Sequence, residues 1–275
     1  MKRRLNLHRA TACAGSLLAL LAVPACLRAE GPSQTALSAY NSYCQQVEGR
    51  LARQHQSQTV FLAPPTSSED PEATLHRGAF IIEQLTSANA QAGNALIHHW
   101  RATAFVPGAH AAEFLHMMQD YGAYPQRFSP QVLAARLLSA NGGHMQVWMR
   151  VRQQHILTVV MDTTYDVTWT SVDPQRGYSA SHSTKIAEIE NPGTSSERAL
   201  DADHDHGFLW RQNTYWTYQE RDGGLYLQVE SISLTRSIPL GLDWIIGPYV
   251  KSVPRESLEF TLRSVCNALR PSSTH

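Results

Sequence analysis

Apolar and polar residues follow two different rhythms along the chain. Between residues 33 and 56, apolar residues recur at steps of three and four, which predicts an amphipathic helix. The apolar face of this helix is expected to carry Leu37, Tyr40, Cys44, Val47 and Leu51. From about residue 95 onward, apolar and polar residues instead alternate, which is typical of strands with one buried face.

Turn signals divide the alternating region into separate strands. A linker rich in Pro and Ser precedes a short predicted strand at 78–82; a longer strand follows at 95–106, and a helix at 109–118. Antiparallel strands are then predicted at 132–139, 144–153, 157–171, 176–189, 208–221 and 225–236. The last element is a helix whose apolar stripe begins just after Pro254, a residue that suits the first turn of a helix.

This order of elements predicts an α+β fold. An antiparallel sheet with one apolar face needs a cover, and the C-terminal helix offers a single apolar stripe that can supply it. The stripe consists of Leu258, Leu262, Val265 and Leu269. We therefore expect the long C-terminal helix to pack on the sheet, with the helix at 33–56 as an addition at the N-terminus.

The first residues have the order of a secretory leader. Four basic residues precede an apolar run over 10–25, which is too short for a comfortable bilayer span. We expect residues 1–29 to be a signal peptide, with an uncleaved anchor as the alternative. Residues 23–26 also resemble a bacterial lipoprotein cleavage box, in which Cys26 would be lipidated. The predicted localisation is secreted or periplasmic, with lipid anchoring through Cys26 as a variant of it.

Charge and cysteine content change once the leader is removed. The whole chain has 23 basic and 23 acidic residues, and the leader holds five of the basic ones and none of the acidic ones. The mature chain is therefore mildly acidic, which argues against nucleic acid as a partner. Cys44 and Cys266 remain, and an oxidising compartment would allow them to form a disulfide. The alternative is that both are buried thiols.

Three stretches resemble a known superfamily. They are the segment 98–121, which reads as a strand, a small-residue turn, a short helix and Asp-Tyr; the segment 207–216; and the segment 233–258. Over residues 95–270 the chain resembles START-like (helix-grip) proteins, in particular secreted bacterial members of unassigned activity. The resemblance implies a curved sheet that grips the last helix, with an apolar cavity between them. Residues 30–94 lie outside the usual domain, and 271–275 form a tail.

The implied cavity is where a ligand is expected. Flexible methionines and aromatic walls suit irregular apolar ligands. The candidate ligand-binding residues are Met145, Val147, Met149, Trp210, Trp216, Tyr218, Leu227, Val229, Leu258 and Leu262. The favoured function is binding of a lipid or other apolar small molecule without chemistry and without a cofactor. The alternatives are a polyketide cyclase/dehydrase-like enzyme that uses the same cavity, or an envelope interaction module with a filled core.

An apolar segment before the last helix is a second candidate. Residues 238–250 are bounded by Pro and Gly, which predicts an irregular loop. Through Trp244, Ile245 and Ile246 the loop could gate the cavity or touch a membrane surface. The alternative is that it packs over the end of the sheet as part of the core.

Catalytic and metal motifs are missing from the sequence. No nucleophile elbow, zinc-protease motif or phosphate loop is present. A cyclase-like enzyme could use Asp120, Arg150, Arg211 or Glu230, but Arg150 and Glu230 fall on the polar side of their strands, which predicts that they face water. The run at 203–206 places two histidines on one side of an extended segment, and two ligands rarely hold a metal.

Overall fold

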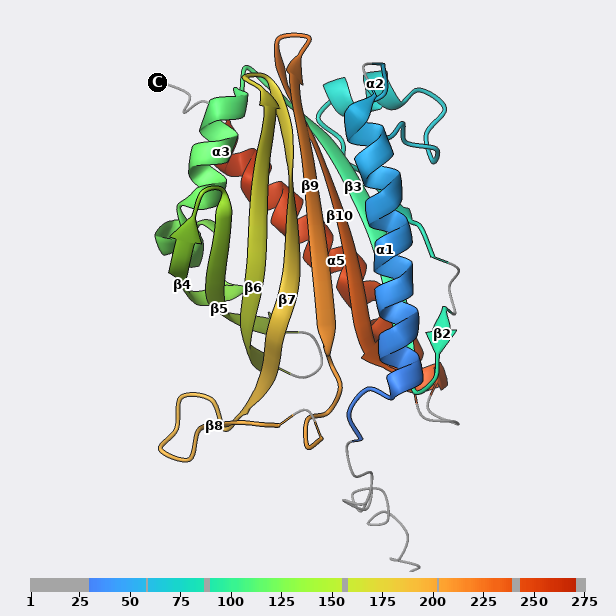
Figure 1. Ribbon diagram of the computed structural model, residues 1–275, viewed down its shortest axis with the longest axis vertical. Helices are drawn as coiled ribbons and strands as arrows, with labels where there is room; N and C mark the ends of the chain where they lie inside the picture. The colour runs from blue at the N-terminus through green and yellow to red at the C-terminus, as the bar shows by residue number, and fades with distance from the viewer. Residues whose placement is uncertain are drawn as a thin grey trace, which may run out of the picture.

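The computed structural model describes residues 30–57, 59–86, 90–154, 158–201, 203–238 and 243–270, and for residues 243–251 it describes the backbone alone. An antiparallel sheet runs through the molecule in the strand order β1–β3–β10–β9–β7–β6–β5–β4 (Figure 1). The strands of this order are β1 (Ile81–Gln84), β3 (Ala95–Pro107), β4 (Val132–Asn141), β5 (His144–Gln154), β6 (Thr158–Asp173), β7 (Arg176–Glu190), β9 (Arg211–Arg221) and β10 (Gly224–Arg236). The short strands β2 (Gln91–Ala92) and β8 (Arg198–Ala199) pair with β3 and β7.

Two long helices lie on opposite faces of the sheet (Figure 1). α5 (Asp243–Leu269) crosses one side, here called the inner face, and lies mainly against β3 with further contacts to β10 and β1. α1 (Gln34–Gln56) covers the other side, here called the outer face, and packs against residues of β3, β9 and β10. The predicted α+β helix-grip fold is confirmed.

α1 forms where the spacing of apolar residues predicts a helix. Ser33 caps it, because the Ser33 side chain accepts a hydrogen bond from the backbone N–H of Ala36. The buried positions of the helix are Ala36, Tyr40, Cys44, Val47 and Leu51, which pack with Ala95, Ile97, Tyr215, Ile232 and Leu234 of the sheet. The central strands β3 and β10 are therefore covered on both faces, and their side chains are buried almost without interruption.

α5 begins earlier than predicted. Its first residue is Asp243, so Pro254 lies well inside the helix rather than in its first turn. The apolar stripe itself is confirmed: Leu258, Leu262, Val265 and Leu269 are buried in the cluster on the inner face. None of the helices that the structure describes is long and apolar enough to cross a membrane.

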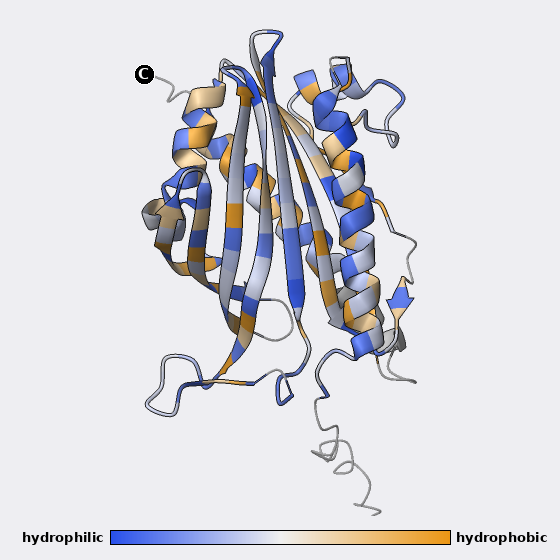
Figure 2. Cartoon of the chain, in the orientation of Figure 1, coloured by the Kyte–Doolittle hydropathy of each residue, from blue (hydrophilic) through white to orange (hydrophobic). Residues whose placement is uncertain are grey.

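Short helices close the end of the inner face away from the start of α5. They are α3 (Ala111–Gln119), the single 3-10 turn η1 (Tyr121–Ala123) and α4 (Tyr124–Arg127). Phe114 of α3 is fully buried and contacts the rings of Trp216 and Tyr218. On the other side, α2 (Pro71–His76) lies against β3 and β1. Apolar and hydrophilic residues alternate along strands such as β6, as expected for a sheet whose two faces have different partners (Figure 2).

Gly177→Ala is expected to destabilise the fold. A Cβ at position 177 would lie 2.3 Å from the Tyr218 hydroxyl oxygen and 2.4 Å from the carbonyl oxygen of Thr170. Because Tyr218 is fully buried, the clash should lower the free energy of unfolding by about 1–3 kcal/mol. Urea unfolding measures the loss. Gly122→Ala is the matched control, because the nearest atom to its added Cβ is 3.7 Å away; an equal effect of the two substitutions would contradict the packing at Gly177.

Candidate functional site

Most of the predicted ligand-binding residues lie on the inner face. Those that take part in its apolar cluster are Met145, Val147, Met149, Trp216, Tyr218, Leu227, Val229, Leu258 and Leu262. Alternation along the strands therefore identified the side of the sheet correctly. Opposite residues 252–269 the cluster is continuous, and Leu227, Leu262 and Val265 have no solvent exposure. This half of the interior is filled with side chains.

Trp210 is the exception, and its predicted place is wrong. It belongs to the cluster beneath α1 on the outer face, together with Tyr215 and Leu234. The prediction assigned Trp210 and Trp216 to the same face because they are an even number of residues apart, but β9 begins only at Arg211. Trp210 lies in the irregular segment before the strand, where its indole N–H donates to Asp205 Oδ1 (3.0 Å). Parity along a strand does not extend past the point where the strand begins.

The inner face is less well covered at β4 and β5. Apolar residues of this region that are only partly buried are Val132, Ala135, Met145, Met149 and Trp169. α5 lies mainly over β3, while α4 and the turn η1 lie against β4. The sheet therefore extends beyond the helix that it grips, and part of its apolar wall stays accessible.

A band of polar side chains crosses the inner face next to the apolar cluster. The Tyr165 hydroxyl donates to Gln212 Oε1 (2.8 Å), and Gln212 Nε2 donates to Ser231 Oγ (3.3 Å). The register places Tyr165 opposite Ser183, whose hydroxyl accepts from the backbone N–H of Gln212 (2.9 Å). The band therefore combines the small side chains of Ser183 and Ser231 with the larger ones of Tyr165 and Gln212.

Trp100 adds an unused donor to this band. It stands opposite Ser231 in the register of β3 and β10, and it packs against the inner-face cluster. Its indole Nε1 is buried and has no hydrogen-bond acceptor within the described structure. A buried N–H without a partner costs free energy. The inner face therefore offers one polar group that a bound molecule with an acceptor atom would satisfy.

The other inner-face titratable side chain near this band is His98. Its ring Nε2 lies 3.0 Å from the hydroxyl of Thr235, and burial lowers the pKa of His98 to about 4. The ring is therefore neutral at physiological pH. His98 and His99 point to opposite faces, as predicted from their adjacent positions in a strand.

The predicted gate segment has a different backbone from the expected loop. Trp244, Ile245 and Ile246 belong to the first turns of α5, since the helix begins at Asp243. Their side chains lie outside the described residues, so their contact with a ligand or a membrane stays a prediction. The possible disulfide is not formed, and the alternative of two buried thiols is confirmed: Cys44 and Cys266 are free and lie in separate clusters on opposite faces of the sheet.

A buried charged cluster lies on the outer face, where the sequence predicted contact with water. Glu230 is 1% exposed and His99 is 2% exposed, because α1 covers the strands that carry them. Glu230 Oε2 accepts from Arg50 Nη2 (2.5 Å) and lies 2.9 Å from His99 Nε2. Beside this group, Arg101 donates through Nε and Nη2 to Glu83 Oε2 (3.1 and 2.8 Å). The expectation that Glu230 faces water is therefore wrong.

These groups form a hydrogen-bonded chain that starts at α1. The Tyr43 hydroxyl lies 3.0 Å from His99 Nδ1, and the other ring nitrogen of His99 reaches Glu230. Burial, together with the Glu230 charge, raises the pKa of Tyr43 against the opposing effect of Arg50. Burial alone would raise the pKa of Glu230, but the contacts with His99 and Arg50 outweigh it and lower that pKa. Glu230 is therefore a carboxylate at neutral pH.

Sequence reasoning missed this cluster because it treated polar strand positions as solvated. The polar parity of β3 and β10 faces α1, and the predicted helix already carries Tyr43 and Arg50 on the side that meets them. A sheet covered on both faces has no water-facing side at its centre. The sequence did contain a signal for this covering, namely the two helices predicted at opposite ends of the chain.

The remaining candidates for catalysis have structural partners near the surface. Arg150 forms ion pairs with Asp162 (2.7 Å) and Glu197 (2.8 Å). Asp120 pairs with Arg127, and Arg211 donates to the backbone of the preceding residue.

Residues of the run 203–206 also have hydrogen-bond partners close by. Asp205 accepts from the backbone N–H of Gly207 and from the Trp210 indole, while His206 Nδ1 lies 2.8 Å from Glu188 Oε2. Within the described residues no three His, Cys, Asp or Glu side chains gather as metal ligands would.

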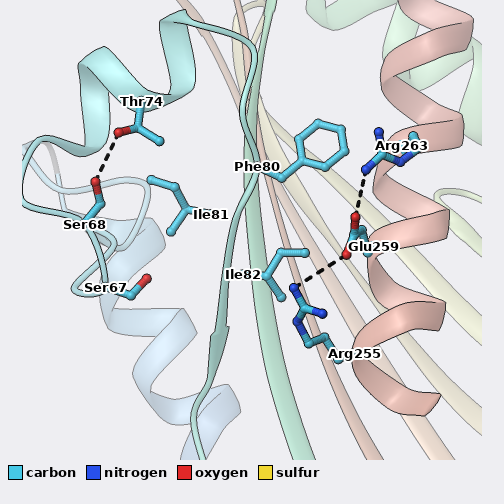
Figure 3. A pocket seen from close by; sticks show the side chains of 9 residues that line it. All are labelled: Ser67, Ser68, Thr74, Phe80, Ile81, Ile82, Arg255, Glu259 and Arg263. Atoms are coloured by element: carbon cyan, nitrogen blue, oxygen red, sulfur yellow. Dashed lines mark hydrogen bonds and ion pairs between the residues drawn. The ribbon is translucent and has the colours of Figure 1, made fainter. Parts of the chain in front are cut away.

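Two clefts open between described residues, and both lie beside elements of the segment 30–94. The first has a volume of about 490 Å³ and lies between the β1 edge and α5 (Figure 3). There Arg255 and Arg263 both pair with Glu259, so each charged side chain of this cleft has a partner, with one more arginine than acid (Figure 3). The second, here called the outer cleft, has a volume of about 630 Å³ and lies between α1, the segment 57–66 and β3.

Known proteins share the fold of this chain at low sequence identity. No protein-family model matches the sequence, and no curated protein matches it. One similar structure is a STAR-related lipid transfer protein fragment from Xanthomonas axonopodis (17% identity, 69% of this chain and 99% of that one, TM-score 0.42). A second is a START superfamily protein from Mycobacterium smegmatis (15% identity, 64% of this chain and 97% of that one, TM-score 0.39). A third is the Zhui aromatase/cyclase from Streptomyces sp. R1128 (15% identity, 63% of this chain and 91% of that one, TM-score 0.41). These likenesses concern the START-like fold alone.

Glu230→Gln is expected to destabilise the protein. The amide keeps the shape of the side chain but removes the charge that compensates Arg50. Breaking a fully buried ion pair costs about 3–5 kcal/mol. Because the Arg50 side chain is 36% exposed, the loss here should be smaller, about 1–3 kcal/mol. Chemical denaturation measures the change. The matched control is Glu190→Gln, which removes a carboxylate from an exposed pair with Arg198 and should have little effect. A Glu230 variant as stable as the control would show that the cluster is not buried.

Stability is expected to fall as the pH is lowered from 6.5 towards 4. Burial holds the folded-state pKa of both His98 and His55 at about 4, whereas an unfolded histidine titrates near pH 6.5. The unfolded state therefore binds more protons in this window, and the stabilisation present above pH 6.5 is lost as the pH falls. For His98 the loss at pH 5 is about 1–2 kcal/mol.

His98→Gln should flatten part of this pH dependence and leave the part that His55 contributes. The measurement is the urea midpoint at pH 7.5 and at pH 5. His144→Gln, at an exposed position, should leave the difference between the two midpoints unchanged. An unchanged difference in the His98 variant would mean that the His98 ring is accessible to protons in the folded state.

Proposed function

We propose that this protein binds an apolar small molecule or lipid that carries a polar acceptor group, between the inner face of the sheet and the first half of α5. Binding occurs without chemistry. The observation that carries the proposal is the Trp100 indole N–H, which is buried on the inner face with no acceptor among the described residues, beside the polar band of Tyr165, Gln212 and Ser231. An oxygen of the ligand would take the place of the missing acceptor.

The division of the inner face supports an amphipathic ligand. One half holds the packed apolar cluster and stabilises the fold, while the other half carries the polar band, in which Ser183 and Ser231 accompany Tyr165 and Gln212. α5 begins at the end of the sheet where β10 ends, and its backbone at 243–251 lies at that end (Figure 1). Met145 and Met149 flank Val147, which is paired with Tyr165 in the register of β5 and β6, and they extend an apolar and partly exposed wall beside the band. A ligand tail on that wall would bury apolar surface, and its head would meet the polar band.

A cyclase/dehydrase-like enzyme in the same space is the alternative. The observation in its favour is His98, a buried imidazole on the inner face. With a pKa of about 4, however, His98 is a weak proton acceptor at neutral pH. The charged residues that such an enzyme would need have partners elsewhere. Glu230 pairs with Arg50 on the outer face, and Arg150 pairs with Asp162 near the surface. Binding without catalysis therefore accounts for more of the side chains.

Export to the periplasm or the outside of the cell belongs to the same proposal. Residues 1–29 lie outside the described part of the chain, and the basic, apolar and small-residue order of this segment supports a leader. The mass of the protein from its native source distinguishes a chain cleaved near residue 29 from one lipidated on Cys26.

Trp100→Phe is expected to weaken ligand binding while keeping the aromatic packing. The probe is N-phenyl-1-naphthylamine, an uncharged fluorophore that brightens in apolar surroundings, displaced by a panel of uncharged lipids with carbonyl groups. Loss of the indole donor should weaken the best lipid by about fivefold to tenfold, as expected for one hydrogen bond of about 1 kcal/mol or slightly more.

A second variant tests the apolar wall. The double substitution Met145→Gln with Met149→Gln should weaken both probe and lipid, whereas Phe208→Gln, at an exposed aromatic away from this wall, should weaken neither. Displacement curves of both inner-face variants that match the wild type, with the fold intact by circular dichroism, would refute a ligand site on the inner face.

A further inference from the structure

The outer cleft carries a charge pattern that the inner-face site leaves unexplained. Arginine side chains reach it from both walls: Arg50 and Arg53 from α1, and Arg101 from β3. None of its described lining residues is acidic. Glu230 and Glu83 lie outside the lining, where they hold Arg50 and Arg101 in place. The cleft therefore presents positive charge to solvent.

Two of these cations have donors to spare. Arg53 makes no ion pair or hydrogen bond within the described structure. Arg101 uses Nε and Nη2 for Glu83, and its Nη1 lies 4.0 Å from Glu230 Oε1, which is beyond hydrogen-bond distance. Glu230 Oε1 is itself buried without a hydrogen-bond partner. Buried charged groups normally have all their donors and acceptors paired. Here an acceptor for Arg101 Nη1 and a donor for Glu230 Oε1 are missing among the described residues.

The rest of the cleft is mainly apolar, and its uncharged polar side chains are those of Tyr43, Gln54, Ser57 and Thr66. Its walls include Val47, Val60, Pro64 and Leu85, and its volume of about 630 Å³ falls in the range of small-molecule sites. An inorganic ion would leave these walls in contact with water. A molecule with an anionic head and a short apolar body would pair with the arginines and cover the walls.

We propose that the outer cleft binds a small organic acid, a carboxylate with an apolar body, through Arg53 and Arg101. The free N–H groups of Arg101 Nη1 and the guanidinium of Arg53 take the carboxylate, and the apolar body lies along Val60 and Pro64. The sheet separates this site from the inner face, so the two sites bind independently.

The test compares octanoate with octanamide, which has the same apolar body and no charge, by calorimetry on the mature chain from residue 30. Octanoate should bind, with an affinity that falls as salt is raised, and octanamide should bind at least tenfold more weakly, as expected for a charge-assisted contact.

Arg53→Gln should weaken octanoate binding about tenfold. Arg198→Gln, which removes one arginine from an exposed pair far from the cleft, should leave octanoate binding unchanged. Arg53 has no partner to lose, so its replacement should not lower the melting temperature.

The position at which octanoate binds is measured separately, by photo-cross-linking with a diazirine analogue of octanoate. Cross-linked peptides should come from α1 and from the segment 59–66, and Val60→Trp, which fills the cleft at a half-exposed position, should abolish them. Cross-links confined to inner-face strands, equal binding of octanoate and octanamide, or an Arg53→Gln variant with wild-type affinity would overturn the proposal. Displacement of octanoate by an equal concentration of inorganic phosphate would also overturn it, because the apolar body would then contribute nothing.

Discussion

The constraint on which the structure depends is that its central strands are covered on both sides. β3 and β10 lie between α1 and α5, and neither face of this pair meets water over most of its length. Any polar side chain in these strands must therefore find its partner inside the protein. Glu230 meets this requirement with Arg50 and His99, and Arg101 meets it with Glu83. Without α1 the same residues would form an ordinary solvated face.

This arrangement gives the two faces different tasks. On the inner face, hydrophobic burial between α5, α3 and the sheet holds the fold together, and a small polar band interrupts it. On the outer face, ion pairs beneath α1 replace solvent, and a cleft with positive charge remains beside them. The N-terminal helix is therefore part of the same folded unit as the sheet: its residues complete a charged cluster that starts on β3 and β10.

The sequence allowed prediction of the elements and of most of the inner face, because alternation in β5 and the stripe of α5 are local patterns. Met145, Val147 and Leu262 lie where those patterns place them. The errors arose wherever the answer depended on long-range contacts. Trp210 was assigned by a parity that ends where β9 begins, and Pro254 marked a helix start that α5 passes through. Glu230 was taken for a solvated residue because no local pattern shows that a helix almost two hundred residues earlier covers it.

The measurement that tests the central claim most directly is native mass spectrometry of the protein purified from its own source, followed by solvent extraction of whatever is bound. The account predicts one apolar molecule with a polar acceptor group per chain, released on unfolding. A chain recovered without any bound molecule, and unchanged after incubation with a panel of lipids and polyketides, would contradict the ligand site and favour an interaction module with a filled core.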